Sequence, residues 1–103
     1  MRAVEVYAKQ LAQVLLGIEI DVEFGEQPSR EVASWGSRRL QFNVKNLGKR
    51  WFDLDKNREA IDDLIIHEFG HHYSANHLSE EYYHALSRLG AKAMQAMREG
   101  RLH

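Results

Sequence analysis

The sequence predicts an α+β fold in which helices pack on a small three-stranded sheet, in the order α-β-β-β-α-α. Apolar residues recur at spacings of three and four near both ends of the chain, which is typical of helices. In the middle they alternate with polar residues, which is typical of strands. The chain has 103 residues, of which 44% are apolar and 28% charged. This composition predicts one globular domain, residues 1–103.

The first helix is predicted within residues 1–17. Its apolar positions lie on one face, and Gly17 follows as a stop signal. Polar residues, among them Glu5, Lys9 and Gln10, interrupt the segment, so it lacks the apolar run of a signal peptide or a membrane span. We therefore expect a cytoplasmic protein with no membrane partner. The predicted inward positions are Val4, Tyr7, Ala8, Leu11, Val14 and Leu15.

Three strands are predicted next. Residues 18–24 alternate strictly between apolar and acidic side chains, as in a strand with one buried face. Residues 25–30, GEQPSR, are predicted to form a turn that ends this strand. Residues 32–48 predict two further short strands around Gly36, the second of which contains the sequence LQFNV, residues 40–44.

Two helices are predicted after the strands. From about Asn57 apolar residues cover most of a helical wheel, which predicts a central helix, and Ser79 is a suitable N-cap for a last helix. The apolar positions of the central helix are Ile61, Leu64, Ile65, Ile66, Phe69 and Tyr73. The predicted inward stripe of the last helix contains Tyr82, Leu86, Leu89, Ala93 and Met97, and Met94 is also assigned to the core.

Charge and cysteine content narrow the classes of function. The net charge is −1 at pH 7 and the basic residues are scattered along the chain, so no nucleic-acid partner is predicted. Because there is no cysteine, histidine and carboxylate side chains are the only strong metal ligands available.

A metal-binding motif lies in the central helix. His67 and His71 are four residues apart, so their rings share one helical face and can bind one ion. Glu68 stands about 100° away around the helix and can reach a water molecule beside that ion. This is the pattern H-E-x-x-H, in which two imidazoles bind zinc and the glutamate is the general base.

The segment HEFGHHYSANH, residues 67–77, resembles the zincin metallopeptidases, and most closely the metzincin pattern. The resemblance implies one Zn²⁺ per chain, His77 as the third ligand, and hydrolysis of peptide or protein substrates. Ser74 stands where the metzincin pattern has glycine, and no methionine-bearing turn is evident. The resemblance also implies a substrate-aligning edge strand. The sequence LQFNV is a candidate for this strand and equally fits a strand of the core.

The sequence leaves the third ligand and the oxyanion donor open. A glutamate from the last helix, Glu80 or Glu81, is the alternative third ligand, although acids in a first turn also favour the helix dipole. His72 and His84 are predicted to be peripheral. The candidates for an oxyanion donor are Tyr73, Tyr82, Tyr83 and Arg38.

The alternative function is a non-catalytic zinc-binding interaction or regulatory module. LGKRWFD and HHYSANHLSEEYYHAL also look like the C-terminal end of some bacterial proteins that begin with a histidine-kinase-like ATPase domain. That second resemblance implies a separated C-terminal module of such a protein.

Overall fold

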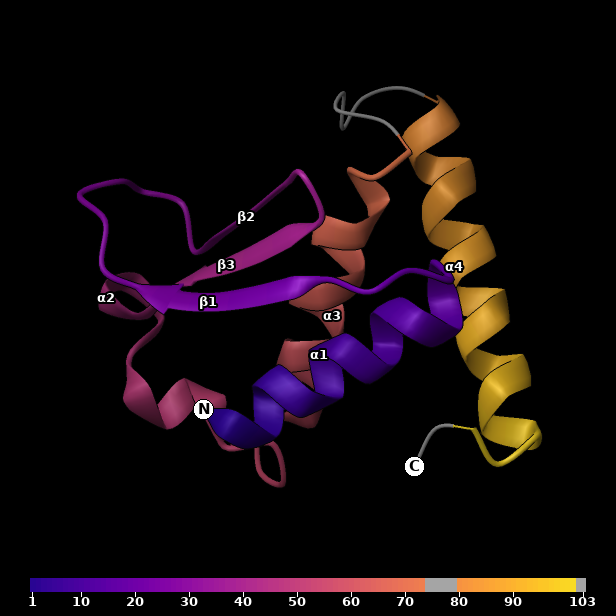
Figure 1. Cartoon of the computed structure of the whole chain (residues 1–103), viewed down its shortest axis with the longest axis horizontal. Helices are drawn as coiled ribbons and strands as arrows, with labels where there is room; N and C mark the ends of the chain where they lie inside the picture. The colour runs from indigo at the N-terminus through magenta and orange to yellow at the C-terminus, as the bar shows by residue number, and fades with distance from the viewer. Residues whose placement is uncertain (74–79, 102–103) are drawn as a thin grey trace.

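The computed structural model describes residues 1–73 and 80–101, and it confirms the predicted α+β class (Figure 1). An N-terminal helix precedes a three-stranded mixed sheet, and two long helices that pack together follow it. The long helices are α1 (Arg2–Leu15), α3 (Arg58–Gly70) and α4 (Glu80–Arg98). The strands are β1 (Asp21–Gly25), β2 (Ala33–Gly36) and β3 (Arg39–Asn43). A short helix α2 (Val44–Leu47) and a 3₁₀ turn η1 (Lys49–Phe52), which were not predicted, connect the sheet to α3.

The strand order is β1-β3-β2, with β1 parallel and β2 antiparallel to the central strand β3. A two-residue turn joins β2 to β3, and its residues Ser37 and Arg38 have φ angles of 50° and 57°. Positive φ at both positions matches the right-handed twist of a hairpin. The turn therefore lies just after Gly36, the residue on which the sequence centred it.

Of the two roles that LQFNV fitted, the structure confirms the core strand and excludes the sheet edge. Most of this sequence is β3, which pairs with strands on both sides, and Leu40 and Phe42 are completely buried. Local alternation is the same in an edge strand and a central strand, because it reports only which face is buried. The edge strand nearest to α3 is β2 instead.

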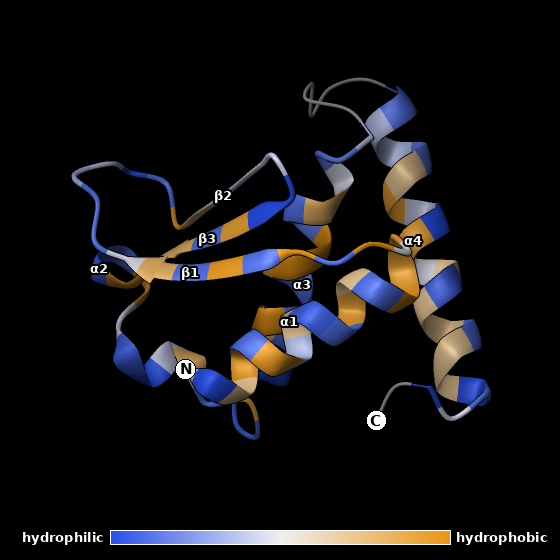
Figure 2. Cartoon of the chain, in the orientation of Figure 1, coloured by the Kyte–Doolittle hydropathy of each residue, from blue (hydrophilic) through white to orange (hydrophobic). Residues whose placement is uncertain are grey.

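The core lies between the sheet and the long helices, with α4 against both α1 and α3 (Figures 1 and 2). The Tyr7 hydroxyl donates a hydrogen bond of 2.5 Å to Asp62 and so ties α1 to α3. No helix in the described part of the chain is long and apolar enough to cross a membrane. The completely buried side chains of the core are Val4, Leu40, Phe42, Ile61, Ile65, Phe69 and Leu89, together with Ala8 and Ala12.

The apolar stripe of α4 differs from the predicted one. Met94 and Met97 are 59% and 62% exposed, so the prediction that they belong to the core is wrong. Small residues, Ala85 and Ala96, are buried instead and let α4 lie close to its neighbours. Tyr73 follows the end of α3 and is 40% exposed, again unlike the prediction. The predicted N-cap Ser79 lies outside the described residues.

Candidate metal site

The last turns of α3 bring three potential metal ligands together. The rings of His67 and His71 have centroids 5.3 Å apart and stand nearly perpendicular. One ligand atom from each histidine and one carboxylate oxygen of Glu68 all lie within 4.8 Å of one another. The i, i+4 spacing on one helix is sufficient to place the two imidazoles, as the sequence predicted.

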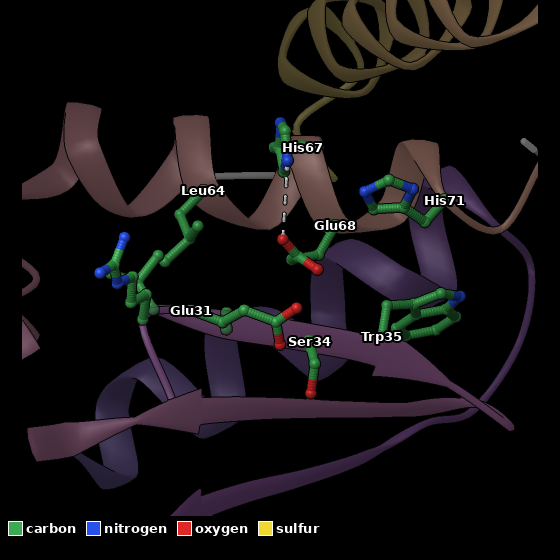
Figure 3. Close-up of a pocket in the computed structure, with 10 residues that line it drawn as sticks. Glu31, Ser34, Trp35, Leu64, His67, Glu68 and His71 are labelled. Carbon is green, nitrogen blue, oxygen red and sulfur yellow. Dashed lines mark ion pairs between the residues drawn. The ribbon is translucent and has the colours of Figure 1, made fainter. Parts of the chain in front are cut away.

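The three side chains open into a cleft of about 530 Å³ between α3 and β2 (Figure 3). Figure 3 shows Glu68 directed across the cleft toward β2 and the segment before it, with the His67 and His71 rings beside it. The cleft therefore provides room for a ligand next to the histidines. Its lining residues from the β2 side are Arg30, Glu31, Val32, Ala33, Ser34 and Trp35, and those from α3 are Leu64, His67, Glu68 and His71.

Glu68 is a buried acid on the α3 side of this cleft. It is 6% exposed, and one of its carboxylate oxygens lies 3.8 Å from His67 Nε2. Burial raises the pKa of Glu68 to about 7, and the negative charge of Glu31 adds to this shift. A carboxylate with this pKa can both accept and return a proton near neutral pH.

Glu31 reaches the cleft because two asparagines hold the segment between β1 and β2. The Asn43 side chain binds the main chain of Gln27 through two hydrogen bonds of 3.1 and 3.2 Å, and it donates to the Glu31 carbonyl at 3.0 Å. The Asn46 side chain donates to the same carbonyl at 2.8 Å. Sequence reasoning missed these residues, and an asparagine at the end of a strand carries no signal of such a distant partner.

Tyr82 of α4 contacts His67. Its hydroxyl oxygen lies 3.0 Å from His67 Nδ1, and the hydroxyl donates to the His67 carbonyl, also at 3.0 Å. Burial and the nearby acids Glu68 and Asp63 raise the pKa of Tyr82, so the hydroxyl keeps its proton at neutral pH.

The four side chains predicted as oxyanion donors all lie off the cleft lining. Tyr82 is directed to His67, and Arg38 lies in the β2–β3 turn beside a different pocket. Tyr73 and Tyr83 are 40% and 60% exposed. None of these four side chains therefore lies where an oxyanion in the cleft would form.

The predicted third ligand, His77, lies outside the described residues. Glu80 and Glu81 are described at the start of α4, where both are exposed, and neither belongs to the group of neighbouring ligand atoms. His72 is exposed and its ring contacts Trp35, with centroids 5.9 Å apart. His84 is also exposed, so both histidines are peripheral as predicted.

The chemistry of the group fits zinc. Neutral imidazoles and carboxylates are ordinary zinc ligands, and Zn²⁺ with histidine ligands needs no thiolate. His67 and His71, with Glu68 beside them, could therefore hold such an ion. Comparison with known proteins returned no match among family models, curated proteins or solved structures.

Proposed function

We propose that the protein is a zinc-dependent metallopeptidase of the zincin type, with His67 and His71 as ligands of one zinc ion and Glu68 as the general base. The observation that supports this most directly is a buried glutamate within 4.8 Å of two imidazoles, in the lining of a cleft. A purely structural metal site needs ligands but no adjacent proton acceptor.

Zinc bound to such a site lowers the pKa of water and polarises a carbonyl group. His67 and His71 would hold the ion from one face of α3. Glu68 accepts a proton from the attacking water and delivers it to the leaving amine. The pKa of Glu68 in the metal-free protein, about 7, lies in the range where both transfers are efficient, although a nearby cation lowers it.

In this proposal β2 takes the substrate-aligning role that the sequence assigned to LQFNV. β2 pairs with β3 on one side, and Ala33, Ser34 and Trp35 line the cleft that faces α3. An extended peptide can add to such an edge through main-chain hydrogen bonds. The substrate class is therefore a peptide or an extended protein segment.

His77 is proposed as the third ligand on the strength of its spacing from His71. Glu80 and Glu81 lie outside the ligand group in the described structure, which favours the histidine over the glutamate alternative.

The test compares wild type with Glu68→Gln, which keeps the size of the side chain but cannot accept the proton. Both proteins should bind one zinc per chain, whereas peptide cleavage should fall by about 100-fold or more in the variant. Metal analysis after dialysis and a screen of unfolded proteins and peptide libraries measure the two properties. Zinc binding by both proteins, with a fourth protein ligand that excludes water, would instead identify a non-catalytic zinc module.

A further inference from the structure

Tyr82 packs its side chain against the turn of α3 that carries both histidines. It is 3% exposed. The centroid of its ring lies 5.9 Å from that of His67 and 5.3 Å from that of His71. Its hydroxyl oxygen lies 3.0 Å from Nδ1 of the His67 ring.

The hydrogen bonds of this hydroxyl define the ring protonation of His67. A carbonyl oxygen only accepts, so the single hydroxyl proton of Tyr82 goes to the His67 carbonyl. The phenolic oxygen can then accept a hydrogen bond from His67 Nδ1–H. This arrangement leaves the in-plane lone pair of the neutral ring on Nε2, the atom that lies 3.8 Å from the Glu68 carboxylate.

The end of α3 makes the main-chain part of this contact possible. In an α-helix the His71 N–H would donate to the His67 carbonyl. Here it donates to the Glu68 carbonyl at 3.0 Å, and the next two residues continue with the same tighter spacing. The hydroxyl of Tyr82 donates to the His67 carbonyl at this point, so a single group contacts both the main chain and the ring of His67.

We propose that Tyr82 is a positioning residue that holds His67 in the Nδ1-protonated tautomer and so presents Nε2 to the metal ion. The inference rests on the proposed zinc site. The tautomer, however, is set by contacts within the protein and can be measured without metal or substrate. Partners of this kind fix the orientation of a histidine ligand and raise its affinity for the ion.

The first test is the ¹⁵N NMR spectrum of the His67 ring in the zinc-free, full-length chain at about pH 8, where imidazoles are neutral. Nδ1 should resonate as a protonated nitrogen and Nε2 as an unprotonated one. In Tyr82→Phe, which keeps the aromatic ring, the Nε2-protonated tautomer should become populated. Predominant Nε2–H in wild type would overturn the proposal, as would an unchanged tautomer in the variant.

The second test is zinc affinity, measured by competition with a chelating dye. Tyr82→Phe should bind zinc about 10- to 100-fold more weakly. The matched control is Tyr83→Phe on the same turn, where the side chain is 60% exposed and the affinity should not change. Equal losses in both variants would contradict a specific role for Tyr82.

Neither measurement depends on hydrolysis, so the two proposals can fail separately. If Tyr82→Phe does not fold, the tautomer of the wild-type protein still decides the question. The expected tautomer and loss of affinity in a protein that cleaves no peptide would support the role of Tyr82 and count against the peptidase function.

Discussion

Gly70 and Tyr82 lie so close together that a Cβ atom on Gly70 would be 2.8 Å from Cε1 of the tyrosine ring. The same atom would lie 3.0 Å from Cδ2 of Leu86. Glycine is a poor helix former, yet at this position its lack of a side chain lets α4 approach the turn between Glu68 and His71. The close approach of the two helices brings the Tyr82 hydroxyl within hydrogen-bond distance of His67.

Gly70→Ala should therefore displace Tyr82, lower zinc affinity and reduce the free energy of unfolding by about 1–3 kcal/mol. The matched control is Gly90→Ala in α4, where an added Cβ meets nothing within 4 Å. This control should gain about 0.5–1 kcal/mol because alanine is the better helix former. Urea unfolding and zinc titration of both variants measure the effects. A Gly70→Ala protein as stable as wild type would show that the helices have room to separate.

The third ligand is tested by substitution. His77→Ala should weaken zinc binding strongly, whereas Glu80→Ala and Glu81→Ala should change only the first turn of α4, by a few tenths of a kcal/mol. The latter two residues are exposed and serve as matched controls. Isothermal titration of zinc into the three variants compares them directly. Loss of zinc binding in one of the glutamate variants alone would identify that glutamate of α4 as the third ligand.

Glu68 should make the stability of the zinc-free protein depend on pH. Its pKa is about 7 in the folded protein, whereas the ordinary value of 4.5 applies to the unfolded chain. Between pH 4.5 and about 7 the folded protein therefore binds a proton that the unfolded chain releases. Stability should therefore fall as the pH rises from 4.5 to about 7, by at most about 3 kcal/mol.

The pH effect is isolated by comparing wild type with Glu68→Gln in the presence of a chelator. The two proteins share every other ionisable group, Glu31 beside residue 68 included, so the other contributions largely cancel. The difference in free energy of unfolding between the two proteins should change across this pH range in favour of the variant. A constant difference would show that Glu68 titrates normally.

Zinc should stabilise the folded protein. At a free concentration 100 times the Kd, binding raises the free energy of unfolding by about 2.7 kcal/mol. This gain should disappear below about pH 6.5, where the imidazoles become protonated, and also on addition of a chelator. Thermal unfolding with and without zinc provides the measurement. His67→Ala is the control, and it should unfold at the same temperature in both conditions.

Asn43 should be important for stability although it is a polar residue. It is 5% exposed and binds the main chain at Gln27 and Glu31. Asn43→Ala removes these hydrogen bonds and should cost about 1–3 kcal/mol. Asn46→Ala at the exposed neighbouring site should cost less. Hydrogen exchange of the Gln27 amide, which donates to Asn43, reports whether the segment is released.

The sequence was most informative where a feature depends on local geometry. The apolar residues of α1, spaced by three and four, share one helical face, and so do His67 and His71. Both results follow from helix geometry alone, and the structure agrees with both. The stop at Gly17 is also local, and that glycine has a φ of 70°.

Features that depend on distant partners could not be predicted in this way. β3 is central because β1 pairs with its second side, and no residue within β3 reports that pairing. Tyr82 was predicted as an inward residue, but its hydrogen-bond partner is fifteen positions earlier in the chain. Met97 was assigned to the core because its spacing fits a helical stripe, yet it is 62% exposed and its neighbour Ala96 is buried instead.

The two hydrogen-bonding edges of β3 should pair with their neighbouring strands at different times during folding. The β2–β3 hairpin needs only the two-residue turn at Ser37 and Arg38, and hairpins of this kind close within about 1–10 μs. The parallel pairing with β1 begins at Asp21 and Arg39 and must close a longer loop first. We therefore expect β3 to pair with β1 later than with β2. Substitutions that weaken β1 would leave that side of β3 unpaired for longer and promote aggregation, because an unpaired strand edge binds other chains.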